Sequence, residues 1–270
     1  MAQGLSDGGP SPRARPGFRP VKSAYRALDV LEAMAAGPST LSDLSRKLDI
    51  PKSSLHGLLR TLTDRGWVAT MDRGTRYRLG LRALQVGARF VDEDELVSQV
   101  APSLDRLAAA TGETVQQARL DGDQVVYLAK RDSAHPVRLI STIGSRLPAH
   151  ATALGKVLLA SRDDAALRDL VRPPMKALTS RTIIEWDPLR AELAATRARG
   201  YAVDDGEAAD GLRCFAVTVP GPHLRDGAGV PTDAISVSVP AYRLDEQREQ
   251  ELVDALLAEQ ARMSGLASAW

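Results

Sequence analysis

The first quarter of the chain spaces its apolar residues as three short amphipathic helices do. We expect helices over 23–36, within 39–50 and within 52–66, and two short strands at 67–69 and 77–79. The apolar faces of the three helices are, in order, Leu28, Leu31, Met34 and Ala35; Leu41, Leu44 and Leu48; and Leu55, Leu58, Leu59 and Leu62. Three short helices followed by a hairpin predict a winged helix-turn-helix.

Polar residues at the expected helix ends support this interpretation. Ser23 is a candidate N-cap for the first helix, and Gly37 followed by Pro38 would end it. Thr40 can cap the second helix, with Asp43 at the favoured acidic position of the first turn. These boundaries therefore agree with the apolar pattern.

The rest of the chain mixes helical and strand periodicity. Helices are expected at 81–91, 95–110, 152–160, 163–171, 187–199 and 245–262, and strands at 114–120, 124–130, 137–142, 214–219 and 234–239. Asp121 and Gly122, between the first two strands, are a hairpin signal. Because strands pair locally and helices come in blocks, the predicted fold class is α+β with a largely antiparallel sheet.

Charge divides the chain as well. The net charge is +1, yet residues 1–90 hold 15 Lys and Arg against 7 Asp and Glu, and the remainder holds 20 against 27. We expect a disordered basic tail at 1–20, a DNA-binding domain at 21–80, a linker helix at 81–94 and a second domain at 95–270. A basic part joined to an acidic part suggests a polyanionic partner for the basic part only.

The third helix carries the residues expected to touch double-stranded DNA. Its non-core positions are small or basic, and no acidic residue occurs between Lys52 and Arg60. Lysine and arginine suit phosphates or guanine edges, and serine suits phosphates or any base. The expected contacts are Lys52, Ser53, Ser54, His56 and Arg60 on the helix, and Arg73 and Arg76 in the wing. The alternative is an ordinary solvated helix face with ordinary surface arginines.

Several stretches together resemble the IclR family of bacterial transcriptional regulators. They are YRALDVLEAMA, LSDLSRKLDIPKSSLHGLLRTLTDRGWV, RLPAHATALGKVLLA, LTSRTI, LRAELAATRARGYAVDDGEAADGLRCFAVTV and AISVSVPAYRL, in the family's order. The resemblance implies a GAF-like effector-binding domain after the linker helix and control by a small organic acid. It also implies a homodimer or homotetramer on a palindromic operator, acting as a repressor more than as an activator. Gly57 departs from the family, which usually has arginine there. A mid-helix glycine costs roughly 1 kcal/mol relative to alanine.

Residues 148–156, PAHATALGK, first suggest a phosphate-binding loop, which needs Gly, four residues, Gly-Lys and then Ser or Thr. His150 and Val157 stand where the first glycine and the hydroxyl residue belong, so the pattern fails. No G-x-S-x-G elbow occurs, Cys214 lies in an apolar run, and the histidines lack metal-ligand spacing. We expect no catalysis, cofactor or metal. The alternative is an enzyme acting on a small carboxylate, with an appended DNA-binding domain.

The same stretch can hold a small anion, because the first N–H groups of a helix have no intrahelical acceptor. A capped helix without any ligand is the alternative. By match to the family's motifs, the effector site would comprise Thr152, Ala153, Leu154, Gly155, Asp204, Cys214, Ser236 and Ser238. No apolar stretch approaches the ~18 residues of a membrane span, and the first residues lack the apolar region of a signal peptide. We therefore expect a cytoplasmic protein with no membrane partner.

Overall fold

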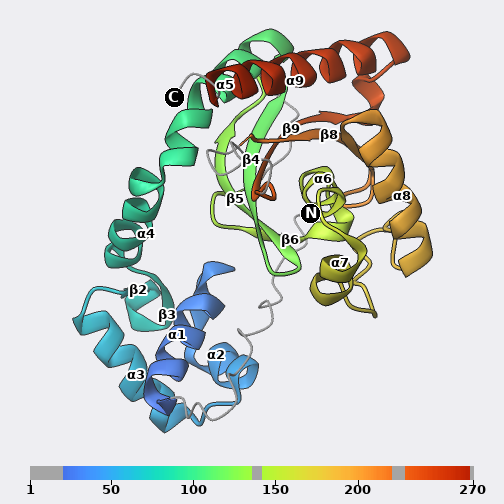
Figure 1. Cartoon of the computed structure of the whole chain (residues 1–270). Helices are drawn as coiled ribbons and strands as arrows, with labels where there is room; N and C mark the ends of the chain where they lie inside the picture. Colours follow the sequence, from blue (N-terminus) through green and yellow to red (C-terminus); the bar gives the residue numbers. More distant parts are fainter. Residues whose placement is uncertain (1–20, 136–141, 221–228, 268–270) are drawn as a thin grey trace. The chain divides into compact units, whose positions relative to one another are not determined.

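The computed structural model describes residues 21–135, 142–220 and 229–267 (Figure 1). The chain divides into two units between Glu93 and Asp94, called the N-terminal and C-terminal units below. The expected tail at 1–20 and nearly all of the expected strand at 137–142 lie outside the described residues.

The N-terminal unit has the three helices and the two wing strands that the apolar pattern predicts, in a winged helix-turn-helix arrangement, and a further two-residue strand that was not expected. Its helices are α1 (Lys22–Ala35), α2 (Leu41–Leu48), α3 (Lys52–Asp64) and α4 (Leu81–Glu93). Its strands are β1 (Ser39–Thr40), β2 (Val68–Met71) and β3 (Arg76–Leu79), and they form an antiparallel sheet in the order β1-β3-β2. A single-turn 3-10 helix, η1 (Asp72–Gly74), joins β2 to β3.

Apolar side chains from α1, α2, α3 and β2, together with Ile50 between α2 and α3, form the core of this unit. The buried set is Val30, Ala33, Met34, Leu44, Ile50, Leu55, Leu59, Leu62 and Val68. Thr40 caps α2 as expected, since its hydroxyl accepts a hydrogen bond from the N–H of Asp43 at 3.2 Å.

Three expectations for α1 are wrong. Leu28 is 56% exposed and Ala35 is exposed, because the inward face runs through Val30, Ala33 and Met34 instead. Ser23 is not the N-cap, since the helix already begins at Lys22 and the N-cap position is Val21, whose side chain makes no cap bond. Apolar residues occur on two neighbouring sides of α1, so its own sequence does not specify which side is buried. Packing against α2 and α3 buries the side with Val30 and Ala33 and leaves Leu28 in solvent.

The C-terminal unit is built on a six-stranded antiparallel sheet in the order β6-β5-β4-β9-β8-β7. The strands are β4 (Thr114–Asp121), β5 (Gln124–Arg131), β6 (Arg146–Pro148), β7 (Ala202–Asp205), β8 (Leu212–Thr218) and β9 (Asp233–Pro240). The edge strands β6 and β7 were not expected, because three or four residues are too short to show a period. Gly122 forms the expected hairpin turn between β4 and β5, with φ of 64°.

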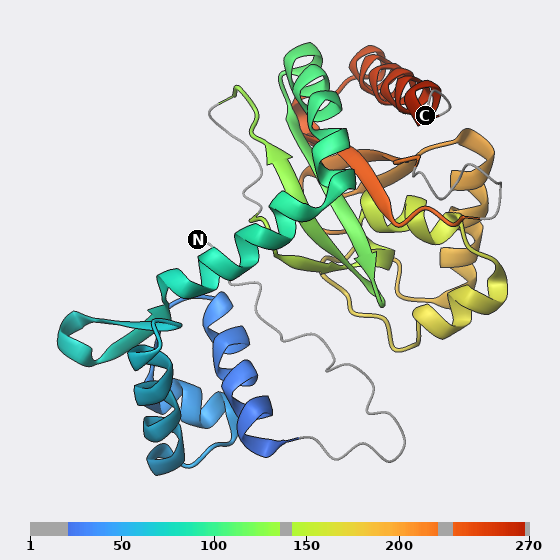
Figure 2. The ribbon, with the colours of Figure 1, turned by 60° about the vertical axis from the view of Figure 1, so that its left-hand side comes forward.

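Helices cover both faces of this sheet (Figures 1 and 2). The helices α5 (Glu95–Thr111) and α9 (Glu246–Ala267) pack against each other and against β4, β5 and β8. The helix α6 (Ala153–Ala160) packs on the other face, with α7 (Asp164–Leu170) and α8 (Trp186–Arg199) beyond it in one apolar cluster. In the described part of the chain, no helix has the length and apolar character needed to cross a bilayer.

Candidate functional site

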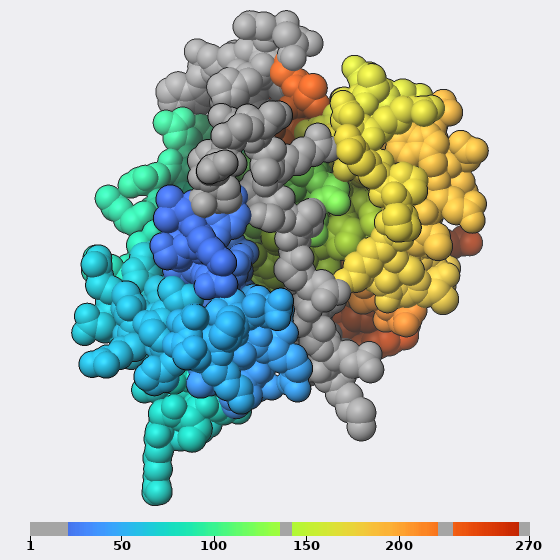
Figure 3. Space-filling view, turned by 90° about the horizontal axis from the view of Figure 1, so that it is seen from below, coloured from blue at the N-terminus to red at the C-terminus, as the bar shows by residue number. Residues whose placement is uncertain are grey.

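The side of α3 that faces away from the core carries every residue expected to contact DNA from that helix. Lys52, Ser53, Ser54, His56 and Arg60 are all exposed. The leucines on the opposite side are buried in the core, which fixes the direction in which the polar side faces. In Figure 3, α2 and α3, in light blue, form part of the face turned toward the viewer.

A groove lies between α3 and the wing strands. It is lined by His56, Arg60, Thr63, Asp64, Thr70 and Tyr77. Thr70 and Tyr77 stand opposite each other on β2 and β3. Neither was singled out from sequence, because only the packing of the wing brings them beside α3. Their hydroxyls can donate hydrogen bonds to phosphate oxygens.

The two wing arginines are placed differently. Arg73 is exposed in the turn between β2 and β3, with φ of 58°. Arg76 is exposed too, but its Nη2 donates a hydrogen bond to the carbonyl oxygen of Pro38 at 2.9 Å. Arg76 therefore ties the wing to the segment between α1 and α2, whereas Arg73 extends from the tip.

Gly57 lies within α3 on the exposed side. A Cβ placed there meets no described atom within 4 Å. Packing therefore does not require glycine at this position, and a longer side chain would extend into the space beside His56 and Arg60.

In the C-terminal unit, the segment around residue 152 forms the start of α6. The N–H of Gly155 donates to Thr152 Oγ1 at 3.0 Å, and the N–H of Lys156 donates to the Thr152 carbonyl at 2.8 Å. The N–H groups of Ala153 and Leu154 are thus the first-turn donors without an intrahelical acceptor. All of these residues are buried.

The Gly-Lys pair in this segment serves packing and an internal ion pair. A Cβ on Gly155 would lie 2.1 Å from the carbonyl oxygen of Ala149, so only glycine allows α6 to approach that turn. Lys156 is 1% exposed. Its Nζ contacts Glu207 Oε1 and lies 3.6 Å from Glu192 Oε1. The ammonium group is therefore neutralised inside the protein.

The remaining expected effector residues lie on the sheet face that α6 covers. Asp204, Cys214 and Ser238 are direct cross-strand neighbours on β7, β8 and β9. Ser236 lies two residues along β9 on the same face, which confirms the expected period of two. We call these four residues the polar row. All four are buried, and strand pairing brings Asp204 close to serines that lie more than 30 positions later in the sequence.

Burial controls the protonation of two members of the polar row. Burial raises the pKa of Asp204 to about 7, although its carboxylate accepts hydrogen bonds from the N–H groups of Glu207 and Ala208 at 2.7 and 3.2 Å. Burial also raises the pKa of the Cys214 thiol well above its usual value. A thiol that stays protonated is a poor nucleophile, so Cys214 does not offer the chemistry of a thiol enzyme.

Two further side chains belong to the same region and were not found from sequence. Gln116 on β4 is buried, and its Oε1 accepts a hydrogen bond from Ser238 Oγ at 3.3 Å. Tyr127 on β5 is buried in the α6 cluster, and burial raises its pKa. The strand β4 also carries Gln117 and Arg119, so no signal in the sequence singled out Gln116.

Ser236 Oγ and Glu207 Oε2, both near α6, are among the buried polar atoms that have no hydrogen-bond partner within the described residues. A buried polar atom without a partner costs about 1–3 kcal/mol, so each is a place where a ligand atom would be stabilised. No cluster of three or more His, Cys, Asp or Glu residues suited to a metal ion occurs in the described ranges.

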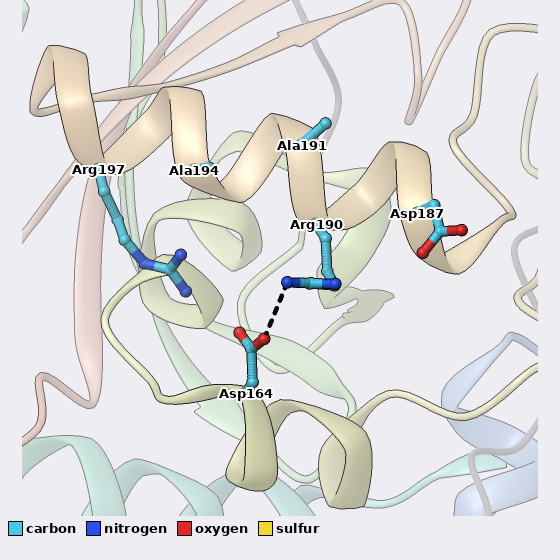
Figure 4. A pocket seen from close by; sticks show the side chains of 6 residues that line it. All are labelled: Asp164, Asp187, Arg190, Ala191, Ala194 and Arg197. Carbon is cyan, nitrogen blue, oxygen red and sulfur yellow. Dashed lines mark ion pairs between the residues drawn. The ribbon is translucent and has the colours of Figure 1, made fainter.

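The surface of the C-terminal unit also has a shallow groove between α7 and α8 (Figure 4). It is lined by Asp164, Asp187, Arg190, Ala191, Ala194 and Arg197. Arg190 pairs with Asp164 at 3.2 Å, and Arg197 donates to the carbonyl of Ala160 at 2.6 Å. Its charged side chains are exposed, so this groove is an ordinary hydrated surface.

Comparison with known proteins agrees with both halves of this description. The model of the IclR helix-turn-helix domain matches residues 23–71, and that of the bacterial transcriptional regulator IclR C-terminal domain matches residues 88–264. The chain is 34% identical to the HTH-type transcriptional regulator KdgR of Escherichia coli over 238 residues, which is 87% of this chain and 89% of that protein. It is 33% identical to the transcriptional repressor IclR of Escherichia coli over 247 residues, 90% of this chain and 88% of that one.

Solved structures show the same relationship. The IclR transcriptional regulator from Alicyclobacillus acidocaldarius superposes with a TM-score of 0.79 at 26% identity, covering 92% of this chain and all of that one (100%). The ranges matched by the two family models include α3 and the polar row under α6. The relatives are transcriptional regulators rather than enzymes. This chain therefore belongs to the IclR family of DNA-binding transcriptional regulators.

Proposed function

We propose that this protein is a transcriptional repressor whose operator binding is controlled by a small organic acid. One observation carries the proposal: a single chain joins an exposed basic helix face on α3 to a buried polar row beneath the start of α6. The choice of repressor follows the relative named transcriptional repressor IclR.

On the DNA side, α3 would act as the recognition helix in the major groove. Its N-terminal turn carries Lys52, Ser53 and Ser54, and His56 and Arg60 follow on the same exposed side. Residues at the N-terminus of a recognition helix commonly reach base edges, while lysine and arginine also bind phosphates. Arg73 at the wing tip is suited to the backbone or the minor groove. Arg76 would contact DNA through N–H groups other than the one bonded to the Pro38 carbonyl, or by exchanging that bond for one to a phosphate.

In the C-terminal unit, the ligand's carboxylate would accept hydrogen bonds from the N–H groups of Ala153 and Leu154. The N-terminus of a helix favours negative charge at that position. Asp204, when protonated, can donate a further hydrogen bond. Ser236 and Ser238 would hold polar atoms at the other end of the molecule. A small carboxylic acid with a second polar group therefore fits this site.

We also propose that the protein binds a palindromic operator as a homodimer or homotetramer. The helix α4 leaves four large apolar side chains uncovered, and Leu81, Leu84, Val86 and Phe90 are each 53–72% exposed. A two-fold contact between copies would bury such a surface. Replacing Leu84 and Phe90 by glutamate should shift the molecular mass in analytical ultracentrifugation toward the monomer. An unchanged mass would remove α4 from the contact.

The DNA assignment is tested by replacing Lys52, His56 and Arg60 together with alanine. Fluorescence anisotropy on the DNA fragment upstream of the protein's own gene should show a loss of affinity of at least ~100-fold, since each good base or phosphate contact contributes about 1–3 kcal/mol. The control variant replaces the exposed Arg168 and Arg172 of the C-terminal unit with alanine, which removes two positive charges, as the test variant does with His56 neutral. Equal effects of the two variants, or none, would refute the assignment to α3.

The effector assignment is tested by a thermal-shift screen of small organic acids on wild type and Ser236→Ala. Because Ser236 Oγ has no partner among the described residues, its removal should cost little stability. An acid that raises the Tm of wild type should raise that of Ser236→Ala much less. The same rise in both proteins would remove Ser236 from the site.

A further inference from the structure

A buried charge cluster lies at one end of the two central strands of the C-terminal unit. Arg119 on β4 stands directly opposite Asp233 on β9. The Nε of Arg119 lies 2.6 Å from Oδ1 of Asp233, and its Nη2 lies 3.0 Å from Oδ2. The Asp233 side chain is fully buried and also accepts a hydrogen bond from Gln117 Nε2 at 2.9 Å. This carboxylate is therefore fixed on two sides.

The same guanidinium holds Asp94, the first residue of the C-terminal unit. Arg119 Nη1 lies 2.5 Å from Asp94 Oδ2, and Nη2 lies 3.0 Å from Oδ1. Asp94 is also the N-cap of α5, because its Oδ1 accepts the N–H of Val97 at 3.1 Å. Hydrogen bonding to Arg119 lowers the pKa of Asp94, so the carboxylate is ionised at neutral pH.

This cluster lies between the candidate effector site and the end of α4. The opposite face of β4 and β9 holds Gln116, Ser236 and Ser238 of the candidate effector site. Asp94 directly follows α4, which ends at Glu93. One guanidinium thus joins the strands of the effector site to the residue at which the chain enters the unit.

We propose that Arg119 is a positioning residue that holds the entry point of the chain against the effector-binding sheet, so that two DNA-binding units keep the spacing an operator requires. The inference rests on the proposed function. A bidentate arginine–carboxylate pair has a defined geometry, which a lysine or a water-bridged contact lacks. Fixed spacing makes the second half-site contact effectively intramolecular, which raises affinity for the whole operator without any new contact.

The test compares two DNA fragments for wild type and Arg119→Gln. One fragment holds the whole palindrome, defined by footprinting upstream of the protein's own gene, and the other holds a single half-site. Loss of positioning should weaken binding to the palindrome by at least ~10-fold and leave half-site binding within about 2-fold. A role limited to stabilising the C-terminal unit would change the thermal midpoint and alter neither DNA affinity.

Two further variants make the result decisive. Arg131→Gln removes the ion pair between β5 and Asp105 of α5, 2.5 Å long, which joins the same sheet to the same helix away from its start. It should leave both affinities unchanged. If Arg119→Gln does not fold, because the buried Asp233 carboxylate loses its cationic partner, Asp94→Asn decides. Asparagine can still cap α5 and leaves the pair between Arg119 and Asp233 intact.

The outcomes separate the two proposals. Wild type that binds neither fragment refutes the proposed function, and this inference with it. The positioning role alone is overturned if wild type prefers the palindrome but Arg119→Gln and Asp94→Asn do not change that preference. This is the case when the two variants keep wild-type affinity for both fragments, or lose the same factor of affinity for both.

Discussion

Two glycines inside helices of this protein should respond in opposite directions to the same substitution. Gly155 lies in the first turn of α6, packed against the turn at Ala149, where a Cβ would lie 2.1 Å from a carbonyl oxygen. Gly57 lies in α3, where a Cβ meets no described atom within 4 Å. Both residues are helical, so the intrinsic preference for alanine is the same in each case, and only the surroundings differ.

The magnitudes follow from these distances. At Gly155 the clash is with backbone, which cannot rotate away, so the cost lies near or above the upper end of the usual overpacking range, about 3 kcal/mol. The helix preference of alanine offsets about 1 kcal/mol of this, which leaves a net loss of about 2 kcal/mol. At Gly57 only the preference remains, and Gly57→Ala should stabilise α3 by up to about 1 kcal/mol.

Native-state hydrogen exchange with mass spectrometry measures the opening free energy of peptides from each unit separately. Peptides of α6 should lose protection in Gly155→Ala, and peptides of α3 should gain protection in Gly57→Ala. Peptides from the other unit serve as the internal control in each variant. Unchanged or increased protection of α6 in Gly155→Ala would show that the turn at Ala149 moves freely, and the packing argument would fail.

Three further predictions concern charged groups. Because burial raises the folded pKa of Asp204 to about 7 from the ordinary 3.8, the folded state holds this proton more tightly. The stability of the C-terminal unit should therefore fall as pH rises from about 4 to about 7, and urea unfolding should show a flatter pH profile for Asp204→Asn than for wild type. If Arg60 binds a phosphate, Arg60→Ala should reduce the slope of log K against log salt for operator binding by about 1, as measured by fluorescence anisotropy over a range of salt concentrations. An unchanged slope would show that Arg60 does not bind a phosphate. Lys156→Met leaves Glu207 buried and unpaired and should cost about 3–5 kcal/mol in urea unfolding, whereas Lys156→Met with Glu207→Leu should recover most of that loss; no recovery would contradict the pairing.

Local signals in the sequence were enough to predict most elements of the fold. Thr40 caps α2 and Gly122 makes the hairpin turn because each depends only on its near neighbours. Leu28 was misplaced because a helix with apolar residues on two adjacent sides does not specify which side packs. The strand β7 was missed because it has four residues and gains its stability from pairing with β8.

The candidate DNA-contact residues could be predicted from local sequence, whereas the candidate effector residues could not. The exposed side of α3 follows from its own periodicity, so its polar residues could be assigned from sequence. The polar row could be assembled only through the family resemblance, because Asp204, Cys214 and Ser238 become neighbours through strand pairing. Neither Gln116 nor the partner of Lys156 was identified, since both depend on which strand or loop lies across from them.

The single cysteine of the chain offers a way to follow ligand binding at the candidate effector site. Cys214 is 7% exposed and its thiol is protonated, so a thiol reagent reacts with it only when the surrounding structure opens. In the native protein the rate of thiol modification therefore measures how often the structure around Cys214 opens, and no introduced probe is needed. An acid that binds at the polar row should lower the modification rate of Cys214 in proportion to its occupancy. The measurement is therefore a ligand-binding assay that needs neither DNA nor knowledge of the operator.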